Sequence, residues 1–338
     1  MSRKVKWGVL STASIATRRV IPAMQKCEFA EIAAISSRSL PTAKSVAANF
    51  AIPKAYGSYE ELLGDPEIEA IYNPLPNHLH AEWTLKAARS GKHVLCEKPI
   101  ALNAAETRKL LEARDESGVK IGEAFMVRTH PQWLRTQELV RSGRIGKLHS
   151  AAGLFSYFNI NPQDVRNVAQ FGGGALLDIG CYTIKTTRFI FGEEPVRAIG
   201  CIERDPSFKI DRLTSAILEY PSGQCIFSVS TQMVYYQKMQ FFGTEGRIDV
   251  EIPFNAPADK PTRIFIDNGK DLYANASAVI ETVPICNQFT IQGDLFSKAV
   301  LENTEVPNPL EEAFCNMAVI DAVFRSAETG KWEVPERL

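Results

Sequence analysis

The sequence predicts a two-domain α/β protein, in which a parallel sheet flanked by helices comes first and mostly antiparallel strands follow. A chain of 338 residues is long for one hydrophobic core. Up to residue 125, strand-like and helix-like patterns alternate, which is typical of a parallel sheet with helices on both faces. Beyond Phe125, strand-like runs follow one another without helices between them, which predicts antiparallel pairing.

The composition is that of an ordinary globular protein, with 45% hydrophobic and 23% charged residues and a net charge of −1. Because basic residues are not concentrated anywhere, neither a nucleic acid nor a membrane surface is expected as a partner. No apolar run approaches the roughly 20 residues that span a bilayer. Met1-Ser2-Arg3-Lys4 leads directly into a strand-like segment, so no secretory signal is predicted.

The seven cysteines are scattered and form no C-x-x-C motif, which predicts reduced core thiols and a cytoplasmic location. The five histidines lack carboxylate or thiolate neighbours at ligand spacing, so no metal site is predicted.

In the first region, five strands are predicted, at residues 5–10, 31–35, 70–72, 93–96 and 120–123. The helices predicted between them cover residues 15–26, 42–50, 59–63, 80–90 and 104–117.

The turn after the first strand is where a dinucleotide-binding fingerprint, G-x-G-x-x-G/A, would lie. The aligned residues are Ser11, Ala13 and Ala16, so only the last position matches. Alone, this pattern fits an ordinary strand–helix turn equally well. Small residues still let the backbone approach a pyrophosphate, and the hydroxyls of Ser11 and Thr12 can donate to phosphate.

The second strand ends in Ser36-Ser37-Arg38, with no acid to bind the ribose 2′-hydroxyl of NAD. A guanidinium beside hydroxyl groups suits a 2′-phosphate, so NADP is preferred over NAD. The alternative is an exposed arginine in a turn.

Two further segments follow strands of the predicted sheet. After the third strand, two prolines precede Asn77, which is a plausible cap for the helix that carries His80. His80 by itself is more often a buried structural histidine than a catalyst. After the fourth strand, the charged pair Glu97-Lys98 is stopped by Pro99 at the sheet edge where ligands bind, although a solvated loop would look the same.

In the second half, His130-Pro131-Gln132 opens a predicted helix that runs to Arg141. The predicted strands cover residues 148–158, 196–203, 215–220, 224–231, 238–243 and 246–251, with a hairpin turn at 221–223. Residues 253–285 are poorly patterned and are left unassigned. Two closing helices are predicted at 288–302 and 310–329.

Three glycines at 172–174 precede a predicted helix that runs from Asp178 to Phe191. Asp178 and Tyr182 are four residues apart, so their side chains leave the same face of that helix. The structural alternative is a carboxylate favoured by the helix dipole beside a half-buried tyrosine.

Taken together, these motifs resemble the glucose–fructose oxidoreductase / inositol dehydrogenase / rhizopine catabolism (Gfo/Idh/MocA) family over nearly the whole chain. The matching segments are Trp7–Ala16, Pro74–His80, Glu97-Lys98-Pro99 and Gly172–Tyr182. The departures are Ser11 and Ala13 in place of glycines, and tyrosine instead of histidine at 182. Both recur in the branch that contains glucose–fructose oxidoreductase, NADP-linked D-xylose dehydrogenase and dimeric dihydrodiol dehydrogenase.

The resemblance implies a Rossmann domain over residues 1–125 and a substrate-binding and oligomerisation domain over 126–338. The second domain would be an α/β domain on a large, mostly antiparallel open sheet, with nicotinamide and substrate meeting between the domains. The exposed face of that sheet commonly forms the subunit interface in the family, which implies a homodimer or homotetramer.

The resemblance also implies hydride transfer between NADP and a sugar, polyol or vicinal diol. Tyr182 would be the acid/base, and Asp178 would hold a substrate hydroxyl. Lys98 would favour the phenolate of Tyr182 and would also hydrogen-bond a ribose or substrate hydroxyl. Glu97 would orient the strand end or the nicotinamide. Further substrate-pocket residues would be Arg128, Arg166 and His130. The implied cofactor-binding residues are Ser11, Thr12, Ala13, Ile15, Ser37, Arg38, Pro74, Leu75, Asn77, His80, Glu97 and Lys98. A trans-dihydrodiol dehydrogenase and a non-catalytic NADP-binding regulator are the alternatives.

Overall fold

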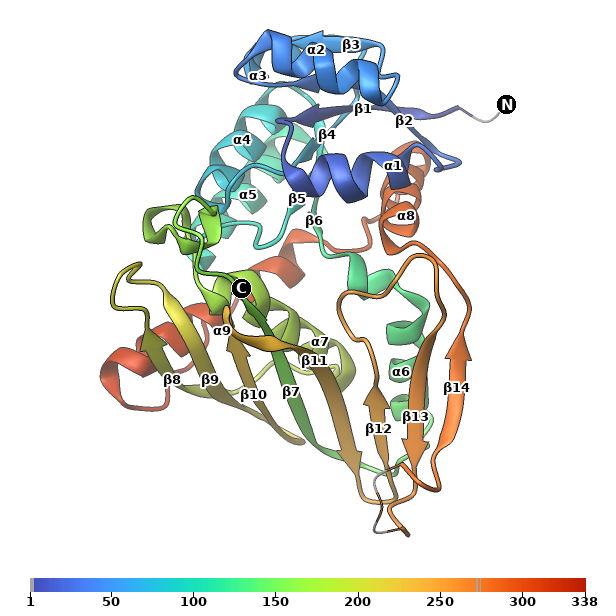
Figure 1. Ribbon diagram of the computed structural model, residues 1–338, viewed down its shortest axis with the longest axis vertical. Coiled ribbons are helices and arrows are strands. Elements are labelled where there is room, and N and C mark those ends of the chain that lie inside the picture. Colours follow the sequence, from blue (N-terminus) through green and yellow to red (C-terminus); the bar gives the residue numbers. More distant parts are fainter. Residues whose placement is uncertain (1–2, 272, 274) are drawn as a thin grey trace. The chain divides into compact units, whose positions relative to one another are not determined.

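The computed structural model describes residues 3–271, 273 and 275–338, so the first two residues of the predicted domain 1–125 lie outside it. The chain forms two compact units, which are coloured along the sequence in Figure 1. Unit 1 comprises Met1–Met126 and Asn287–Phe314, and unit 2 comprises Val127–Cys286 and Cys315–Leu338. This division differs from the predicted one, because residues 287–314 belong to the first unit and not to the second.

Unit 1 contains a six-stranded sheet in the order β3-β2-β1-β4-β5-β6, and all of its strand pairs are parallel. The predicted parallel sheet is confirmed. Its strands are β1 (Val5–Leu10), β2 (Ala30–Ser36), β3 (Lys54–Tyr56), β4 (Ala70–Asn73), β5 (His93–Glu97) and β6 (Ile121–Ala124). The sequence pattern missed β3, since its three residues are too few to show alternation.

The strand order reverses between β1 and β4, which pair side by side at the centre of the sheet. In an open α/β sheet, ligands bind outside the carboxyl ends of the strands at such a switch point. The turn after Leu10, the loop after Asn73 and the segment after Glu97 all begin at this edge. Topology therefore gathers three of the predicted segments at one side of unit 1.

The helices of unit 1 are α1 (Ile21–Met24), α2 (Leu40–Asn49), α3 (Tyr59–Leu63), α4 (Asn77–Arg89), α5 (Ala104–Ser117) and α8 (Gln288–Glu302). The predicted helix 15–26 is a π-helical turn, Ala16–Val20, that continues into the short α1. The prediction that Asn77 caps α4 is wrong. Pro76 occupies the cap position and Asn77 is the first helical residue, because the fixed φ of proline suits a helix start.

Helix α8 joins unit 1 through buried contacts that link distant parts of the sequence. The indole of Trp7, fully buried on β1, donates a hydrogen bond of 3.0 Å to the hydroxyl of Ser297. The same ring packs against Phe296 at a centroid distance of 5.3 Å. The backbone N–H of Phe29 donates to the Asp294 carboxylate at 2.9 Å. Periodicity predicts this helix correctly, but nothing in its pattern identifies the sheet on which it packs.

Unit 2 contains an eight-stranded sheet in the order β14-β13-β12-β11-β7-β10-β9-β8. Only β7 and β10 pair in parallel, so the predicted mostly antiparallel sheet is confirmed. The strands are β7 (Leu148–Phe158), β8 (Arg197–Arg204), β9 (Asp211–Tyr220), β10 (Gly223–Ser230), β11 (Gln232–Gly243), β12 (Arg247–Val250), β13 (Thr262–Asp267) and β14 (Val279–Val283). The last two lie in the segment that the sequence left unassigned.

The helices of unit 2 lie behind its sheet in the view of Figure 1. They are α6 (Pro131–Arg141), α7 (Cys181–Phe191) and α9 (Leu310–Thr329), of which residues from Cys315 onward belong to this unit. The predicted helix from Asp178 begins earlier, as a π-helical turn, Leu176–Gly180, that runs into α7. Three short 3₁₀ turns cover Met126–Thr129, Val165–Asn167 and Ala169–Phe171.

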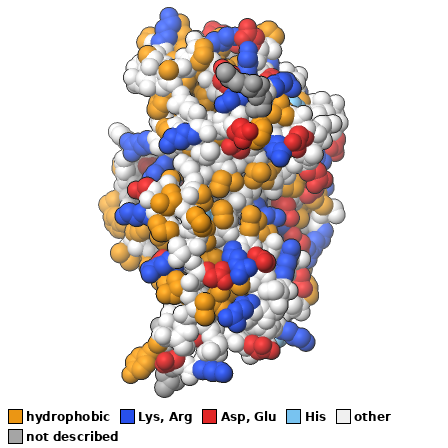
Figure 2. Space-filling model, turned by 90° about the vertical axis from the view of Figure 1, so that its right-hand side faces the viewer, with side chains coloured by type: hydrophobic (Ala, Val, Ile, Leu, Met, Phe, Trp, Pro, Cys, Tyr) orange, Lys and Arg blue, Asp and Glu red, His pale blue; other side chains and the backbone are white. Residues whose placement is uncertain are grey.

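The surface carries both signs of charge, as the net charge of −1 predicts. On the face drawn in Figure 2, lysine and arginine side chains are interspersed with aspartate and glutamate. Four of the predicted core cysteines are buried, whereas Cys201 is exposed and Cys286 and Cys315 are half-buried. Among the described residues, no helix has the length and apolarity needed to cross a bilayer.

Candidate active site

The turn after β1 has the backbone conformation that the glycine fingerprint normally supplies. Ser11 has φ 68°, in the left-handed region that favours glycine. Its hydroxyl oxygen accepts a hydrogen bond of 3.3 Å from the backbone N–H of Ala13. Ser11, Thr12, Ala13 and Ile15 are all partly exposed. Serine thus replaces glycine in this turn, with a local hydrogen bond to support the conformation.

The turn after β2 carries the predicted discriminator of NADP. The backbone N–H of Ser37 donates to the carbonyl of Tyr56 at 3.1 Å, and the Ser37 hydroxyl accepts from the N–H of Ser39 at 3.3 Å. Arg38 is exposed. Burial raises the pKa of Tyr59, and the nearby charge of Arg38 opposes this rise. The charge of Arg38, which follows β2 at the carboxyl edge of the sheet, is therefore near enough to Tyr59 to influence the pKa of its phenol.

His80 is a buried connector between two loops at this edge. It is 1% exposed, with Nδ1 2.7 Å from the carbonyl oxygen of Pro99 and Nε2 2.5 Å from that of Leu75. Burial lowers the pKa of His80 to about 4, so the ring is neutral at physiological pH. Its single N–H can donate to one of the two carbonyls at a time. The N–H of Leu75 donates to the Asn73 side chain at 3.3 Å, which fixes the same loop from its other end.

The main chain on both sides of Lys98 is held by two acids, the half-buried Glu97 and the buried Glu123. The backbone N–H of Lys98 donates to Glu97 at 3.3 Å, and the N–H of Ile100 donates to Glu123 at 3.1 Å. The hydroxyl of Tyr72 donates to the other carboxylate oxygen of Glu97 at 2.6 Å. Burial raises the pKa of Glu97, while the Tyr72 hydroxyl and the Lys98 charge oppose this. Lys98 therefore directly follows the end of β5, and hydrogen bonds fix the position of this strand end.

In unit 2, Gly173 and Gly174 lie where the backbone packs closely against other segments of the chain. Gly174 has φ 119°, and a β-carbon there would overlap a carboxylate oxygen of Asp211. A β-carbon on Gly173 would overlap the carbonyl oxygen of Arg166. Asp211 accepts hydrogen bonds from the Leu176 N–H at 2.7 Å and the Thr214 hydroxyl at 2.8 Å. These contacts fix the start of the π-helical turn that carries Asp178.

Asp178 lies in a small polar cluster at the end of β7. The hydroxyl of Tyr157 donates to its Oδ2 at 2.6 Å, and Nε of Arg166 lies 3.3 Å from the same oxygen. Arg166 also contacts Asp164 at 3.3 Å. Burial raises the pKa of Tyr157, and the Asp178 charge raises it further. The pKa of Arg166 is also raised, chiefly by the Asp178 carboxylate. Arg166 is thus directly beside Asp178.

Tyr182 lies in an aromatic cluster next to these polar residues. Its ring meets Phe155 edge-on at a centroid distance of 5.8 Å and Phe254 at 5.3 Å. Phe155 and Phe254 stack on each other at 4.7 Å. The backbone N–H of Phe254 donates to Gln237 at 2.9 Å. The packing leaves Tyr182 6% exposed and restricts the directions that its phenol can take.

Two other predicted pocket residues lie elsewhere in unit 2. The guanidinium of Arg128 lies 3.7 Å above the ring of Phe189, near the end of α7 that is farther from Asp178. Eleven residues of helix separate Phe189 from Asp178, or roughly 15 Å along the axis. His130 caps α6 by accepting from the Gln132 N–H at 3.1 Å, and burial lowers its pKa to about 4. Neither of these two contacts involves the Asp178 cluster.

Comparison with known proteins now places the chain in a family. A family model described as an oxidoreductase family with an NAD-binding Rossmann fold matches residues 5–125, and the model of the GFO/IDH/MocA C-terminal domain matches residues 133–249. An uncharacterized oxidoreductase of Rhizobium meliloti is 44% identical, with 97% of this chain and 98% of the relative covered. The chain belongs to the Gfo/Idh/MocA oxidoreductase family.

Two further members of this family are similar over nearly their whole length. D-xylose 1-dehydrogenase (NADP(+)) 2 of Haloferax volcanii is 37% identical, with 96% of this chain and 98% of the relative covered. Among solved structures, a 3-ketoreductase from Actinomadura kijaniata in complex with NADP and TDP-benzene has a TM-score of 0.90 at 29% identity, covering 96% of this chain and 98% of that one. The predicted family resemblance is confirmed.

Several residues that shape this Gfo/Idh/MocA site were missed by the sequence reasoning. Tyr157 lies on a correctly predicted strand, two residues after Phe155. This spacing places both side chains on the same face of the strand, which could have identified them as neighbours. Phe254 falls in the unassigned segment. Asp211 precedes the predicted start of its strand, and Glu123 read as an ordinary strand residue. The sequence carried no signal for the acids, because their partners are backbone groups distant in the chain.

Asp211 should make the stability of this protein depend on pH between 4 and 7. Burial raises its pKa from 3.8 to about 6, although the hydrogen bonds from the Leu176 N–H and the Thr214 hydroxyl oppose this rise. Since the folded-state pKa is the higher one, the stabilising contribution is complete below pH 3.8 and is lost as pH rises through about 6. The whole shift corresponds to roughly 3 kcal/mol, at about 1.4 kcal/mol for each pKa unit.

The measurement is the free energy of unfolding in urea for the wild type and for Asp211→Asn. Other titrating groups cancel in the difference between the two proteins. Between pH 5 and pH 7.5, the free energy of unfolding of the wild type should fall by about 1 kcal/mol relative to that of Asp211→Asn. A difference that stays constant over this range would contradict the assignment.

Proposed function

We propose that this chain is an NADP-dependent oxidoreductase that interconverts a hydroxyl and a carbonyl group on a sugar, polyol or related compound. Tyr182 is the acid/base of the proposed reaction, and Lys98 assists it. One observation carries the proposal: Asp178 and Tyr182 follow each other along one helix and are each held by a side chain of β7. This arrangement presents a carboxylate and a phenol together, as oxidation of an alcohol requires.

In the direction of oxidation, Tyr182 removes the hydroxyl proton while hydride leaves the carbon that bears that hydroxyl, so a C–H and an O–H bond are exchanged for a C=O bond. A free phenol has a pKa of about 10, which is too high for a base at neutral pH. The ammonium of Lys98 favours the phenolate. Asp178 accepts a hydrogen bond from a substrate hydroxyl and so orients the reacting carbon. NADP, when bound, takes up or supplies the hydride.

The residues at the carboxyl edge of unit 1 fit this cofactor. The left-handed backbone at Ser11 reproduces the conformation of a phosphate-binding turn. The side chains of Ser11 and Thr12 carry hydroxyl groups, which can donate hydrogen bonds to phosphate oxygens. Arg38 offers an exposed guanidinium where NAD-specific sites place an acid. Pro74, Leu75 and Asn77 follow β4 at the same edge. We assign the 2′-phosphate to Arg38 with Ser37, and a supporting role to His80, which holds the loop of Leu75.

The substrate assignment rests on the relatives and on the site chemistry. A similar protein is named as a D-xylose dehydrogenase, and a similar structure is named as a 3-ketoreductase. A trans-dihydrodiol is the alternative substrate, favoured by the aromatic rings of Phe155 and Phe254 beside Tyr182. The regulator alternative has no support from these names. The proposal includes a cytoplasmic location, which rests on the scattered thiols.

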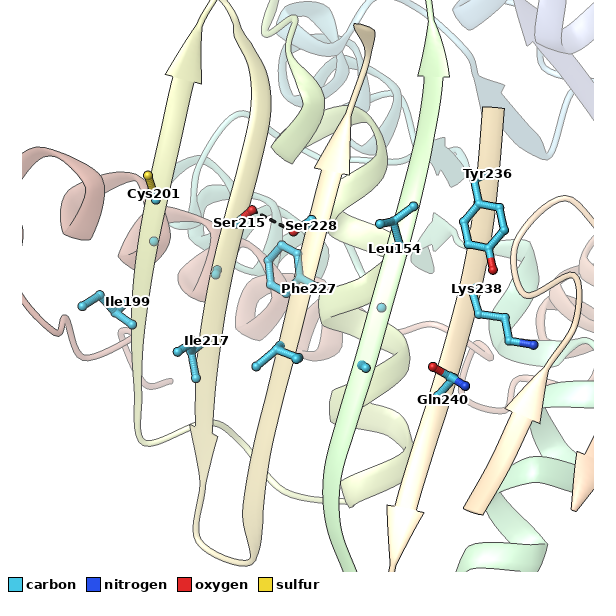
Figure 3. Close-up of a pocket in the computed structure, with 15 residues that line it drawn as sticks. Leu154, Ile199, Cys201, Ser215, Ile217, Phe227, Ser228, Tyr236, Lys238 and Gln240 are labelled. Carbon is cyan, nitrogen blue, oxygen red and sulfur yellow. Dashed lines mark hydrogen bonds between the residues drawn. The ribbon is translucent and has the colours of Figure 1, made fainter. Parts of the chain in front are cut away.

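The proposal also includes a homodimer or homotetramer formed through the open face of the unit 2 sheet. A hollow of about 650 Å³ lies on this sheet. Figure 3 shows side chains of β7, β8, β9, β10 and β11 that line it. Its lining includes Leu154, Ile199, Ile217, Ile226, Tyr236 and Lys238. Ile226 is 51% exposed and Tyr236 is 49% exposed. Exposed apolar side chains that gather on a flat sheet favour a second copy as the occupant.

Tyr182→Phe should lower turnover by about 100-fold or more and leave NADP affinity nearly unchanged, because the phenol proton acts only in the chemical step. Absorbance of NADPH is followed with D-xylose, other aldoses, polyols and trans-dihydrodiols as substrates. Tyr220→Phe is the matched control, since its hydroxyl donates to Thr187 at 3.1 Å and not to Asp178 or its neighbours. Full activity of Tyr182→Phe would remove the acid/base assignment.

Arg38→Ala should weaken NADPH binding at least tenfold more than NADH binding, since only NADPH carries the 2′-phosphate. Fluorescence titrations with both nucleotides measure the two dissociation constants. Arg89→Ala is the control, because this exposed arginine lies at the carboxyl end of α4, which is the opposite edge of the sheet from the switch point. Equal losses for both nucleotides would remove the reason for assigning the phosphate to Arg38.

Ile226→Glu should convert the oligomer into monomers, because a charge buried against an apolar partner surface is costly. Light scattering after gel filtration gives the molar mass of the wild type and the variant. Val334→Glu is the control, since this side chain is 64% exposed on the C-terminal segment. A monomeric wild type, or an unchanged mass in Ile226→Glu, would contradict the proposed interface.

A further inference from the structure

Strand β7 places two aromatic residues on one face, and each contacts one of the proposed catalytic residues. Side chains alternate along a strand, so Phe155 and Tyr157 point to the same side of the sheet. Phe155 packs against the ring of Tyr182, and Tyr157 donates its hydroxyl hydrogen bond to Asp178. One rigid strand therefore sets the positions of both groups.

The hydroxyl of Tyr157 remains a hydrogen-bond donor at physiological pH. Burial and the Asp178 charge both raise the pKa of Tyr157, so its hydroxyl stays protonated at physiological pH. A neutral hydroxyl that donates to a carboxylate at 2.6 Å forms a charge-assisted hydrogen bond, which is stronger than a bond between neutral groups. Tyr157 thus cannot compete with Tyr182 as a base, and it stabilises the ionised form of Asp178.

Arg166 is the second group at this carboxylate, but it restrains Asp178 less tightly. Its Nε lies 3.3 Å from the oxygen that Tyr157 contacts, and its Nη1 lies at the same distance from Asp164. The Arg166 side chain is 47% exposed, so solvent screens its charge. Of these two contacts, the one from Tyr157 is the shorter and comes from a strand inside the sheet.

We propose that Tyr157 is a positioning residue of the active site, whose hydroxyl fixes the direction of the Asp178 carboxylate and keeps it ionised as an acceptor for a substrate hydroxyl. The inference rests on the proposed role of Asp178. It concerns a group that touches Asp178 and not the reacting atoms.

Tyr157→Phe tests the proposal because phenylalanine keeps the ring and removes only the hydroxyl. The carboxyl pKa of Asp178 is measured in the full chain by NMR titration of ¹³C-labelled aspartate, with the resonance assigned by its loss in Asp178→Asn. The pKa should rise by about one unit or more in Tyr157→Phe, as expected when a charge-assisted donor is removed. It should be unchanged in Tyr220→Phe. An unmoved Asp178 pKa in Tyr157→Phe, or an equal shift in the control, would overturn the proposal.

Kinetics with NADP and the substrate found by the screen provide the second measurement. Tyr157→Phe should raise KM about tenfold and move the acid limb of kcat/KM to higher pH, while NADP affinity stays unchanged. In an Asp178→Asn background the same change should cost little, since the two residues act as a unit. If the effects of Tyr157→Phe and Asp178→Asn on KM are fully additive, the proposal is overturned.

The two measurements separate this proposal from the proposed function. The NMR titration needs no substrate, so it tests the Tyr157–Asp178 contact even if Tyr182→Phe keeps full activity. That last result would remove the proposed function alone.

Discussion

The alternation of side chains along β7 is the constraint on which the second unit depends. This strand lies inside the eight-stranded sheet, paired with β11 on one side and β10 on the other. Its register is therefore fixed on both sides, and a slip of one residue would turn every side chain to the other face. Phe155 and Tyr157 reach Tyr182 and Asp178 only in the observed register. The open face of the same strand carries the hollow that we assign to a second copy.

In the first unit, hydrogen bonds from polar side chains, and not strand register, fix the position of a proposed site residue. Lys98 follows a strand end, and polar side chains hold the main chain around it. Glu97, Glu123 and His80 contact the backbone of residues 98–100. Burying such groups is unfavourable unless hydrogen bonds replace their hydration, and each of them has a backbone partner here. These hydrogen bonds offset the desolvation cost of the three side chains and fix the main chain around the half-buried Lys98.

The sequence identified the residues with distinctive chemistry and missed the residues that support them. Lys98 was found because a charged pair at the end of a buried strand is unusual, and Asp178 and Tyr182 because of their helical spacing. Tyr157 was missed because a tyrosine on a strand is ordinary until its partner is known. Asp211 was missed for the same reason, since its partners include the Leu176 N–H, which is distant in the chain. The pocket assignments of Arg128 and His130 rested on the resemblance; in the structure Arg128 packs on the ring of Phe189 and His130 caps α6.

By itself, the sequence determined the two kinds of sheet, most of the helices and strands, and the family, and it named candidate residues for the site. Local patterns carry this information, because periodicity and turn chemistry depend on neighbours in the chain. Only the tertiary structure decided that α8 packs on the first sheet through Trp7 and Ser297, and that Gly173 and Gly174 pack against Arg166 and Asp211. These features depend on contacts between segments far apart in sequence, whose partners no local pattern identifies. The same holds for Tyr157, which became a candidate only when its hydroxyl was located at Asp178.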